Sequence, residues 1–317
     1  MNKICLVGFG NLGFRYFQAI SKLKKNLYLY VIDINGFFKK GYEYQKKNKI
    51  QKNIIFLRNL DEIDEKKIDL VIIATTANSR LNLIEKIKKL FIFDNIIIEK
   101  PITQSETELI KLKKILPKNS WINTQVKNFK IYKDIKKKIN PKNRIKMTVE
   151  GNSWGICCNS LHLIELFNYF CEKKISQIEE TKKLKWVKSK RKNFFELDEG
   201  EIKINFNKNL LFLNSLKNKK LEKWNIKINI QNGNKKWEIY ETNSLIVQIY
   251  NKKKTSHKIP FVSEYMVKII SNILNKNYKK IFIPNFNSSY ILFKPTIRFF
   301  LKKWKEKNKN ALFVPIT

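Results

Sequence analysis

In the first part of the chain, the hydrophobic and polar positions follow two patterns in turn, one typical of strands and one typical of helices. Short strand-like runs, most of them with consecutive apolar residues as in strands buried on both faces, occur at residues 4–7, 27–33, 54–57, 70–74, 95–99 and 121–125. Between these runs, apolar residues recur at the spacing of a helix face, most clearly at residues 14–23, 80–90 and 106–115. Because parallel strands need helical crossovers, this pattern predicts an α/β domain with a doubly wound parallel sheet.

After about residue 142 the pattern changes to strands with alternating or mixed polarity. Strands are predicted at 145–150, 178–188, 201–206, 210–213, 223–231, 235–240 and 244–250, with one helix after Asn159. Asn232-Gly233-Asn234 predicts a hairpin turn, because glycine and asparagine adopt positive φ at little cost. Helices are predicted again at 262–274 and 288–303. The second half therefore predicts an α+β domain with a large, open, mostly antiparallel sheet.

Chain length supports a division into domains. The 317 residues exceed the usual single-domain size of roughly 100–200 residues. We predict a first domain at residues 1–123, a second at 124–285, and a C-terminal helix at 286–317 that packs back on the first domain.

Composition excludes several classes of protein. A content of 43% hydrophobic and 13% aromatic residues permits a sizeable core and argues against global disorder. No apolar run approaches the roughly 20 residues that span a bilayer, and the N-terminus has no signal-peptide pattern. The four cysteines form neither a disulfide framework nor a zinc spacing. A reduced, cytoplasmic protein without a metal site is the expectation.

Net charge is the most unusual bulk property. With 65 Lys and Arg against 27 Asp and Glu, the formal charge is +38. Such a charge is typical of a nucleic-acid or anionic-membrane partner, but equally of lysines scattered over solvated surfaces. Because no zinc finger, RNA-stacking motif or arginine-rich helix accompanies the lysines, we favour solvated surfaces and expect neither partner. A positive field would still concentrate a phosphorylated or nucleotide-linked substrate.

A glycine motif follows the first predicted strand. Gly8-Phe9-Gly10-Asn11-Leu12-Gly13 is a complete G-x-G-x-x-G set that opens an amphipathic helix. In this motif the first glycine makes a tight turn, the second admits a pyrophosphate, and the third lets helix and strand approach closely. The helix N-terminus supplies amides and partial positive charge for phosphates. The motif predicts a dinucleotide-binding Rossmann domain.

The second predicted strand ends at Asp33, twenty residues past Gly13. An acidic residue there bonds the adenosine ribose hydroxyls. A 2′-phosphate beside Asp33 would be repelled by about 1–4 kcal/mol at contact, which favours NAD over NADP. Lys39 and Lys40 lie close enough in sequence to soften that preference.

The fifth predicted strand is followed by Glu99-Lys100-Pro101. On these residues the chain resembles the glucose-fructose oxidoreductase, inositol dehydrogenase and MocA (Gfo/Idh/MocA) family of two-domain NAD(P)-dependent sugar dehydrogenases. Further stretches are similar to the family: Ala74-Thr75-Thr76 beside the cofactor, Trp121-Ile122-Asn123 near the nicotinamide, and the segment 155–166 that carries His162. With the glycine motif, the resemblance places the cofactor on Gly8, Phe9, Gly10, Asn11, Leu12, Gly13, Asp33, Ala74, Thr75, Thr76, Glu99 and Lys100.

The resemblance implies that Lys100 and His162 meet at the substrate hydroxyl or carbonyl. Hydride leaves carbon only as the hydroxyl proton is taken, so imidazole suits the base and ammonium suits the developing alkoxide charge. The other histidine, His257, is predicted in a surface loop. The resemblance and the nearby charges place the substrate on Asn123, Lys127, Cys158, Asn159, Lys190 and Arg191.

Several positions depart from the family pattern. Cys158 stands where the family usually carries Asp, one helical turn before His162, and a thiol cannot orient an imidazolium as a carboxylate does. Either Lys100 and His162 suffice, or Glu165 or a substrate group substitutes, or activity is lost. Glu165 matches the family's acidic residue, but we favour a structural role for it. Lys127, Lys190 and Arg191 either bind a substrate anion or are surface charges.

The expected function is an NAD-dependent oxidoreductase that transfers a hydride between nicotinamide and a sugar. The expected substrate is a nucleotide-linked or acidic sugar of surface-polysaccharide metabolism. The alternative is a dinucleotide- or sugar-binding sensor or regulatory protein, since one fold hosts several functions. The resemblance also implies a homodimer or homotetramer formed through the sheet of the second domain.

Overall fold

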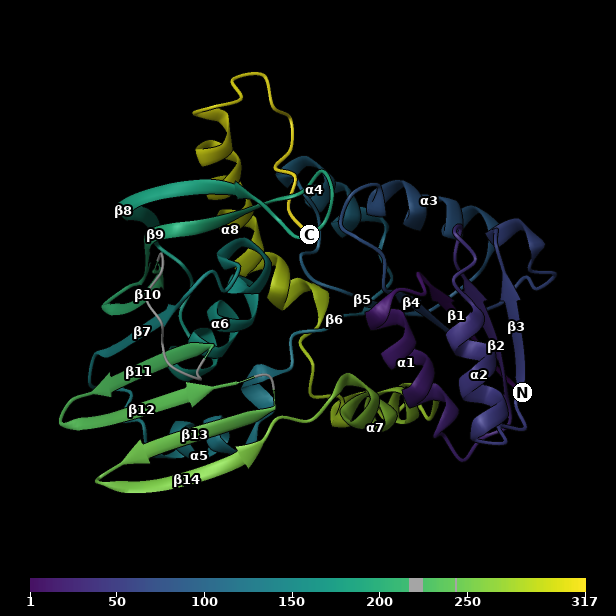
Figure 1. Ribbon diagram of the computed structural model, residues 1–317, viewed down its shortest axis with the longest axis horizontal. Coiled ribbons are helices and arrows are strands. Elements are labelled where there is room, and N and C mark those ends of the chain that lie inside the picture. Colours follow the sequence, from purple (N-terminus) through teal and green to yellow (C-terminus); the bar gives the residue numbers. More distant parts are fainter. Residues whose placement is uncertain (217–224, 243) are drawn as a thin grey trace. The chain divides into compact units, whose positions relative to one another are not determined.

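The structure is a computed structural model that describes residues 1–216, 225–242 and 244–317. The chain divides into two compact units, shown in Figure 1. The first unit comprises Met1–Ile102, Ile110–Asn123 and Pro260–Phe286, and the second unit comprises Thr103–Leu109, Thr124–Ile259 and Asn287–Thr317. Within the described residues, every helix is too short or too polar to cross a membrane.

A six-stranded parallel sheet forms the centre of the first unit. Its strands are β1 (Asn2–Val7), β2 (Leu27–Ile32), β3 (Asn53–Leu57), β4 (Leu70–Ile73), β5 (Asn95–Ile98) and β6 (Asn119–Ile122). They lie in the order β3-β2-β1-β4-β5-β6, which confirms the doubly wound α/β prediction. The strand order reverses between β1 and β4, and the carboxyl ends of strands at such a reversal are where open α/β sheets bind ligands.

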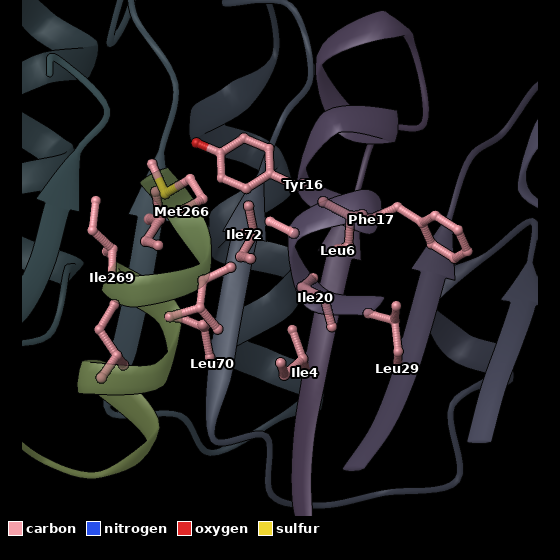
Figure 2. Packing of buried hydrophobic residues seen from close by; sticks show 14 of the residues in the cluster. Ile4, Leu6, Tyr16, Phe17, Ile20, Leu29, Leu70, Ile72, Met266 and Ile269 are labelled. Atoms are coloured by element: carbon pink, nitrogen blue, oxygen red, sulfur yellow. The ribbon is translucent and has the colours of Figure 1, made fainter. Parts of the chain in front are cut away.

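Helices cover both faces of this sheet. They are α1 (Asn11–Ser21), α2 (Lys39–Lys47), α3 (Arg80–Leu90), α7 (Val262–Leu274) and the later part of α4 (Glu106–Ile115), with the short 3-10 helices η1 (Leu60–Glu62) and η3 (Tyr278–Lys280). Helices α1, α2 and α7 lie on one face (Figure 1). Figure 2 shows the Tyr16 ring of α1 directed toward Met266 of α7, whereas the Phe17 ring points to the other side of α1. Both residues belong, with Ile20, to the core cluster packed on the strands. The core of the unit therefore combines residues from both ends of the chain.

Two features of the first unit differ from the sequence expectations. Helix α7 belongs to this unit although its residues fall in the predicted second domain, because Met266, Ile269 and Ile270 are buried in the core against α1. Helix α2 was not predicted, since its sequence is mostly polar and contains Gly41. A Cβ at Gly41 would lie 2.8 Å from the Phe56 ring, so the helix packs closely on the sheet at that glycine.

An eight-stranded mixed sheet forms the second unit. Its strands are β7 (Ile145–Gly151), β8 (Gln177–Lys188), β9 (Phe195–Phe206), β10 (Asn209–Ser215), β11 (Ile226–Asn232), β12 (Lys235–Glu241), β13 (Leu245–Tyr250) and β14 (Lys253–Lys258). Only the β7–β10 pair is parallel among the described strand pairs of this sheet. The open, mostly antiparallel sheet is thus confirmed. Its helices are η2 (Val126–Asn128), α5 (Lys130–Lys138), α6 (Ile156–Cys171) and α8 (Phe286–Lys305).

Some helices and strands of this unit begin at residues other than those predicted from the sequence, because contacts between distant residues set their ends. Helix α6 begins at Ile156, before the predicted start after Asn159, because Gly155 reverses the chain with φ of 74°. His257 lies on β14, not in a loop, since main-chain pairing with β13 suffices to form this polar edge strand. The predicted strand 223–231 begins at residues outside the described part, and β11 is observed from Ile226.

The C-terminal helix is grouped with the second unit. Trp304 of α8 packs edge-on against Trp186 of β8, with ring centroids 5.1 Å apart, and against Phe195 of β9 at 4.7 Å. Arg298 of α8 also pairs with Glu106, which belongs to the same unit. Residues 286–317 are therefore anchored by aromatic and ionic contacts that the sequence pattern alone does not reveal.

Candidate dinucleotide site and substrate helix

The glycine loop between β1 and α1 combines two crowded glycines with one open glycine. A Cβ on Gly8 would lie 2.9 Å from the main chain of Ala74 and Thr75, and a Cβ on Gly13 would lie 1.9 Å from the carbonyl oxygen of Gly8. At Gly10, by contrast, a Cβ would meet nothing within 4 Å. The fold itself requires Gly8 and Gly13, whereas the space at Gly10 is left for a ligand, as the motif predicts.

The N-terminus of α1 has the features of an anion-binding site. Gly10 is the N-cap residue, no side chain caps the helix, and the first turn holds no acidic residue. The free amides of a first helical turn and the positive end of its dipole favour a phosphate group there. Asn11, the first helical residue, is exposed, and Leu12 is partly buried against the core. The loop therefore fits the pyrophosphate of a dinucleotide.

Asp33 is fixed at the end of β2. One oxygen, Oδ2, accepts the Phe9 amide at 2.7 Å and the other, Oδ1, accepts the Asn35 amide at 3.0 Å. The side chain of Phe9 itself is fully buried among Phe14, Phe17, Phe38 and Phe56, so only its main chain faces the loop. A carboxylate held by the glycine loop has remaining lone pairs for ribose hydroxyls. This geometry supports the predicted role of Asp33.

Lys40 is the cation next to this carboxylate. Its Nζ lies over the Phe9 ring at 5.4 Å and over the Phe14 ring at 5.2 Å. Burial lowers the pKa of Lys40, while the charge of Asp33 raises it. The two rings hold the ammonium by cation–π attraction. Of the two neighbouring lysines, Lys39 and Lys40, it is therefore Lys40 whose charge interacts with Asp33.

Glu99 is buried inside the first unit. Its Oε1 accepts the Tyr16 hydroxyl at 2.5 Å and the Asn123 amide at 2.5 Å, and the Tyr265 hydroxyl donates to Asn123 Oδ1 at 2.9 Å. Burial is the main cause that raises the pKa of Glu99, opposed by these two hydrogen bonds. The network ties the end of β5 to α1, β6 and α7. Glu99 was predicted to contact the cofactor and Asn123 the substrate. In the structure the two side chains are hydrogen-bonded to each other inside the first unit.

The loop after β4 contains the predicted A-T-T segment. The hydroxyl of Thr75 is buried and has no hydrogen-bond partner among the described residues, and Thr76 donates its hydroxyl to Asn78. A buried hydroxyl without a partner is unusual in a folded protein and is expected to pair with a ligand. Ala74 and Thr75 also contact Gly8, so this loop and the glycine loop form one surface.

Arg80 is a residue of this region that the sequence patterns missed. Only 1% exposed, it begins α3 and donates to the carbonyl oxygens of Glu99 at 2.6 Å and Ile102 at 3.2 Å, and also to those of Pro101 and Thr75. Its position at the start of the predicted helix 80–90 was the available signal, because a basic residue is unfavourable in the first turn of a helix. Lys100 is partly exposed within the loop that Arg80 holds.

The second unit carries the predicted substrate residues of α6. Cys158, Asn159 and His162 lie in its first turns, and His162 is partly buried, one turn after Cys158. The carboxylate of Glu196 accepts the amides of Cys157 and Cys158, the latter at 3.0 Å. Burial raises the pKa of Glu196, and the amides lower it. Glu196, on β9, therefore caps the helix beside Cys158, a partner that no sequence spacing indicated.

Glu165 is buried within the second unit. It is 4% exposed, accepts the Thr124 hydroxyl at 2.7 Å and the Ser289 hydroxyl, and lies 3.9 Å from Lys127 Nζ. Burial raises its pKa, while the charge of Lys127 lowers it. Its oxygens thus contact the segment 124–127 and α8, which favours the structural interpretation of Glu165. Lys127 is held by the same carboxylate.

Lys190 and Arg191 are separate from α6 along the chain, in the exposed turn between β8 and β9. Arg191 donates to the Thr317 hydroxyl at 2.8 Å. Over the described ranges, no cluster of three or more His, Cys, Asp and Glu side chains suits a metal ion. The second unit therefore brings together Cys158, Asn159 and His162, whereas the structure places Lys190 and Arg191 on another element.

Comparisons with known proteins agree with this geometry. The family model GFO_IDH_MocA, an oxidoreductase family with an NAD-binding Rossmann fold, matches residues 2–127. No curated protein sequence matches the chain. Among solved structures, the dehydrogenase MviM from Clostridium difficile is similar at 11% identity and a TM-score of 0.66, covering 95% of this chain and 99% of its own.

Two further solved structures are similar over nearly the whole chain. An oxidoreductase from Agrobacterium radiobacter in complex with NAD+, L-tartaric acid and magnesium has 12% identity, a TM-score of 0.66 and 94% coverage of both chains. The transcriptional regulator Gal80p from Kluyveromyces lactis has 13% identity and a TM-score of 0.70, covering 96% of this chain and 92% of its own. At these identities the likeness shows the fold alone. The family match and the glycine loop together assign residues 2–127 to the Gfo/Idh/MocA oxidoreductase family with an NAD-binding Rossmann fold.

Proposed function

We propose that the chain is an NAD-dependent oxidoreductase that transfers a hydride between nicotinamide and a sugar hydroxyl or carbonyl. The observation that carries the proposal is the open space at Gly10, above an uncapped helix N-terminus and beside the fixed carboxylate of Asp33. These residues fit the pyrophosphate and ribose of NAD. Bound nicotinamide supplies a hydride acceptor or donor at C4.

The protein's own groups supply the proton chemistry in this proposal. Lys100, at the end of β5, steadies the alkoxide charge that develops as the substrate hydroxyl is oxidised. His162, on α6, takes the hydroxyl proton, because imidazole is the side chain that most often serves as a general base. Glu99 stays internal and fixes the strand from which Lys100 projects. Each residue acts through its own charge or proton, and no metal ion is needed in the scheme.

The substrate class rests on charge. Lys127, Lys190 and Arg191 are the basic residues in the predicted substrate set, and the chain carries a formal charge of +38. Opposite charge concentrates an anionic ligand near a protein surface. We therefore propose a nucleotide-linked or acidic sugar.

Incubating the protein with NAD+ and a panel of nucleotide-linked, acidic and neutral sugars tests this proposal. We expect NADH to form with at least one anionic sugar, and the rate to fall with added salt because screening weakens the attraction. A neutral sugar as the best substrate would contradict the charge argument. Tight NAD+ binding without turnover of any sugar would favour the second candidate below.

Cofactor choice gives a separate prediction. Replacing Asp33 by Asn keeps an oxygen for the Phe9 amide but removes the charge that repels a 2′-phosphate. We expect the affinity for NADP+ to rise relative to NAD+ by roughly tenfold or more, since the repulsion is about 1–4 kcal/mol at contact. Titration of both cofactors into wild type and D33N measures the ratio. Asp64, an acidic residue outside the loop, provides the control variant D64N; equal cofactor ratios in D33N and wild type would refute the role of Asp33.

A second candidate function is a dinucleotide-binding regulatory protein. Cys158 stands where the family usually carries Asp, and Glu196 holds the adjacent amides. The similar structure of Gal80p is that of a transcriptional regulator. These two observations favour regulation, whereas Lys100 and His162, both present in the sequence, favour catalysis.

A further inference from the structure

The guanidinium of Arg80 is surrounded by main-chain carbonyl oxygens. Its Nη1 donates to Glu99, Pro101 and Ile102, and its Nη2 donates to Thr75. The side chain is 1% exposed. Three of these carbonyls lie on the two sides of Lys100 in sequence, and the fourth lies in the loop after β4. One side chain therefore fixes the main chain around Lys100 and joins it to the predicted cofactor loop.

Arginine is an unfavourable residue at this place unless its donors are used. The positive end of the α3 dipole repels a cation in the first helical turn. Burial away from water adds a desolvation cost, which hydrogen bonds must offset. The planar guanidinium presents five donors in a fixed fork, so it can reach several carbonyls at once, whereas a lysine ammonium cannot match that geometry.

Other contacts fix the same loop from the opposite side. The carboxyl group of Glu99 is held by Tyr16 and Asn123, while its carbonyl oxygen is held by Arg80. The loop after β4 is in turn packed against Gly8 through Ala74 and Thr75. The main chain on both sides of Lys100 is thus connected, within the first unit, to the loop that is expected to hold the pyrophosphate.

We propose that Arg80 is a positioning residue that sets the place of Lys100 relative to a bound nicotinamide. This inference rests on the proposed function, because it concerns the lysine assigned to the alkoxide. Arg80 itself touches neither cofactor nor substrate in this scheme. Small displacements matter at such a site, since a shift of about 1 Å can lower a rate by roughly 10²-fold.

Chemical labelling of Lys100 tests the inference without a known substrate. The full chain is acetylated with an N-hydroxysuccinimide ester, with and without saturating NAD+, and the Lys100 peptide is quantified by mass spectrometry. In wild type, NAD+ should slow Lys100 acetylation about tenfold, because the cofactor covers the positioned ammonium. In R80M the protection should fall to about twofold or less, with an intermediate value in R80K, whose ammonium reaches fewer carbonyls.

A matched control separates positioning from general loss of stability. Ile84 lies on α3, one turn after Arg80, and is fully buried, so I84A destabilises the same helix without touching the carbonyls. We expect I84A to keep the wild-type protection of Lys100. The affinity for NAD+ should change less than about threefold in R80K, because the pyrophosphate loop is intact. With a substrate in hand, R80K should lower kcat and leave KM for NAD+ nearly unchanged.

The outcomes distinguish this inference from the proposed function. Absence of NAD+ protection in wild type would refute the place of Lys100 beside the nicotinamide, and the inference would fall with it. Protection in wild type that persists in R80M and R80K would overturn the inference alone. If R80M does not fold, R80K and I84A are compared at equal thermal stability. Only R80K should then show weaker protection of Lys100 by NAD+ than wild type.

Discussion

Replacing Lys100 by Met should lower kcat/KM for the sugar by about 10²–10³-fold, the usual effect of removing one group that stabilises developing charge. The affinity for NAD+ should stay close to that of wild type, because the pyrophosphate and ribose contacts lie on the glycine loop and Asp33. Removing the proton acceptor in H162N should cost about 10²–10⁴-fold. Steady-state kinetics and cofactor titration measure the two quantities separately.

The chain offers matched controls for both substitutions. K118M removes an exposed lysine of the first unit, and H257N removes the second of the two histidines. Neither control should change kcat/KM by more than about threefold, because Lys118 is exposed, His257 is partly buried on an edge strand, and neither residue belongs to the proposed site. If Lys100 and His162 act on one substrate, the double variant should lose less than the product of the single losses. Full activity of K100M would remove the proposed alkoxide partner.

The largest effect on cofactor binding should come from Gly10. The Cβ of a valine there would meet no protein atom within 4 Å, and the residue needs only the extended N-cap conformation already present, so stability should fall by no more than about 1 kcal/mol. Its side chain, however, occupies the space left for the pyrophosphate. We expect the affinity for NAD+ to fall at least roughly 100-fold, equivalent to about 2.7 kcal/mol.

Gly13 provides the opposite case. A Cβ there would lie 1.9 Å from the Gly8 carbonyl oxygen, so G13A must displace main chain, and we expect a loss of about 1–3 kcal/mol or more in unfolding free energy. Urea unfolding and NAD+ titration on both variants separate the two roles. Wild-type NAD+ affinity in G10V would show that the pyrophosphate lies elsewhere, and an unchanged stability of G13A would contradict the packing of the loop.

The parallel sheet and the glycine loop were predictable because their signals are local. Buried parallel strands appear as continuous apolar runs, such as Val71-Ile72-Ile73, and the glycine spacing reports a backbone requirement that the structure confirms at Gly8 and Gly13. The antiparallel sheet was predicted from alternation, which the burial pattern of β7 shows residue by residue. The fold class therefore followed from periodicity and turn residues.

Features that depend on distant contacts were not predictable from the pattern. Helix α7 has an ordinary amphipathic sequence, and only its packing on α1 shows to which unit it belongs. The carboxyl group of Glu99 resembles a ligand-binding group in sequence, but Tyr16 and Asn123 hold it inside. Arg80 and Glu196 act on main-chain groups, which leave no spacing signal. Buried polar partners of this kind are specified by the folded chain, not by neighbouring residues.

Deuterium transfer from the sugar to the cofactor tests whether the protein moves a hydride directly between them. The wild-type protein is incubated with NAD+ and a sugar deuterated at its carbinol carbons, and the NADH formed is analysed by mass spectrometry. Direct hydride transfer predicts that the nicotinamide gains one deuterium at C4 with wild type, at a rate greatly reduced in K100M. NADH without deuterium, or an equal rate in K100M, would contradict the proposed chemistry.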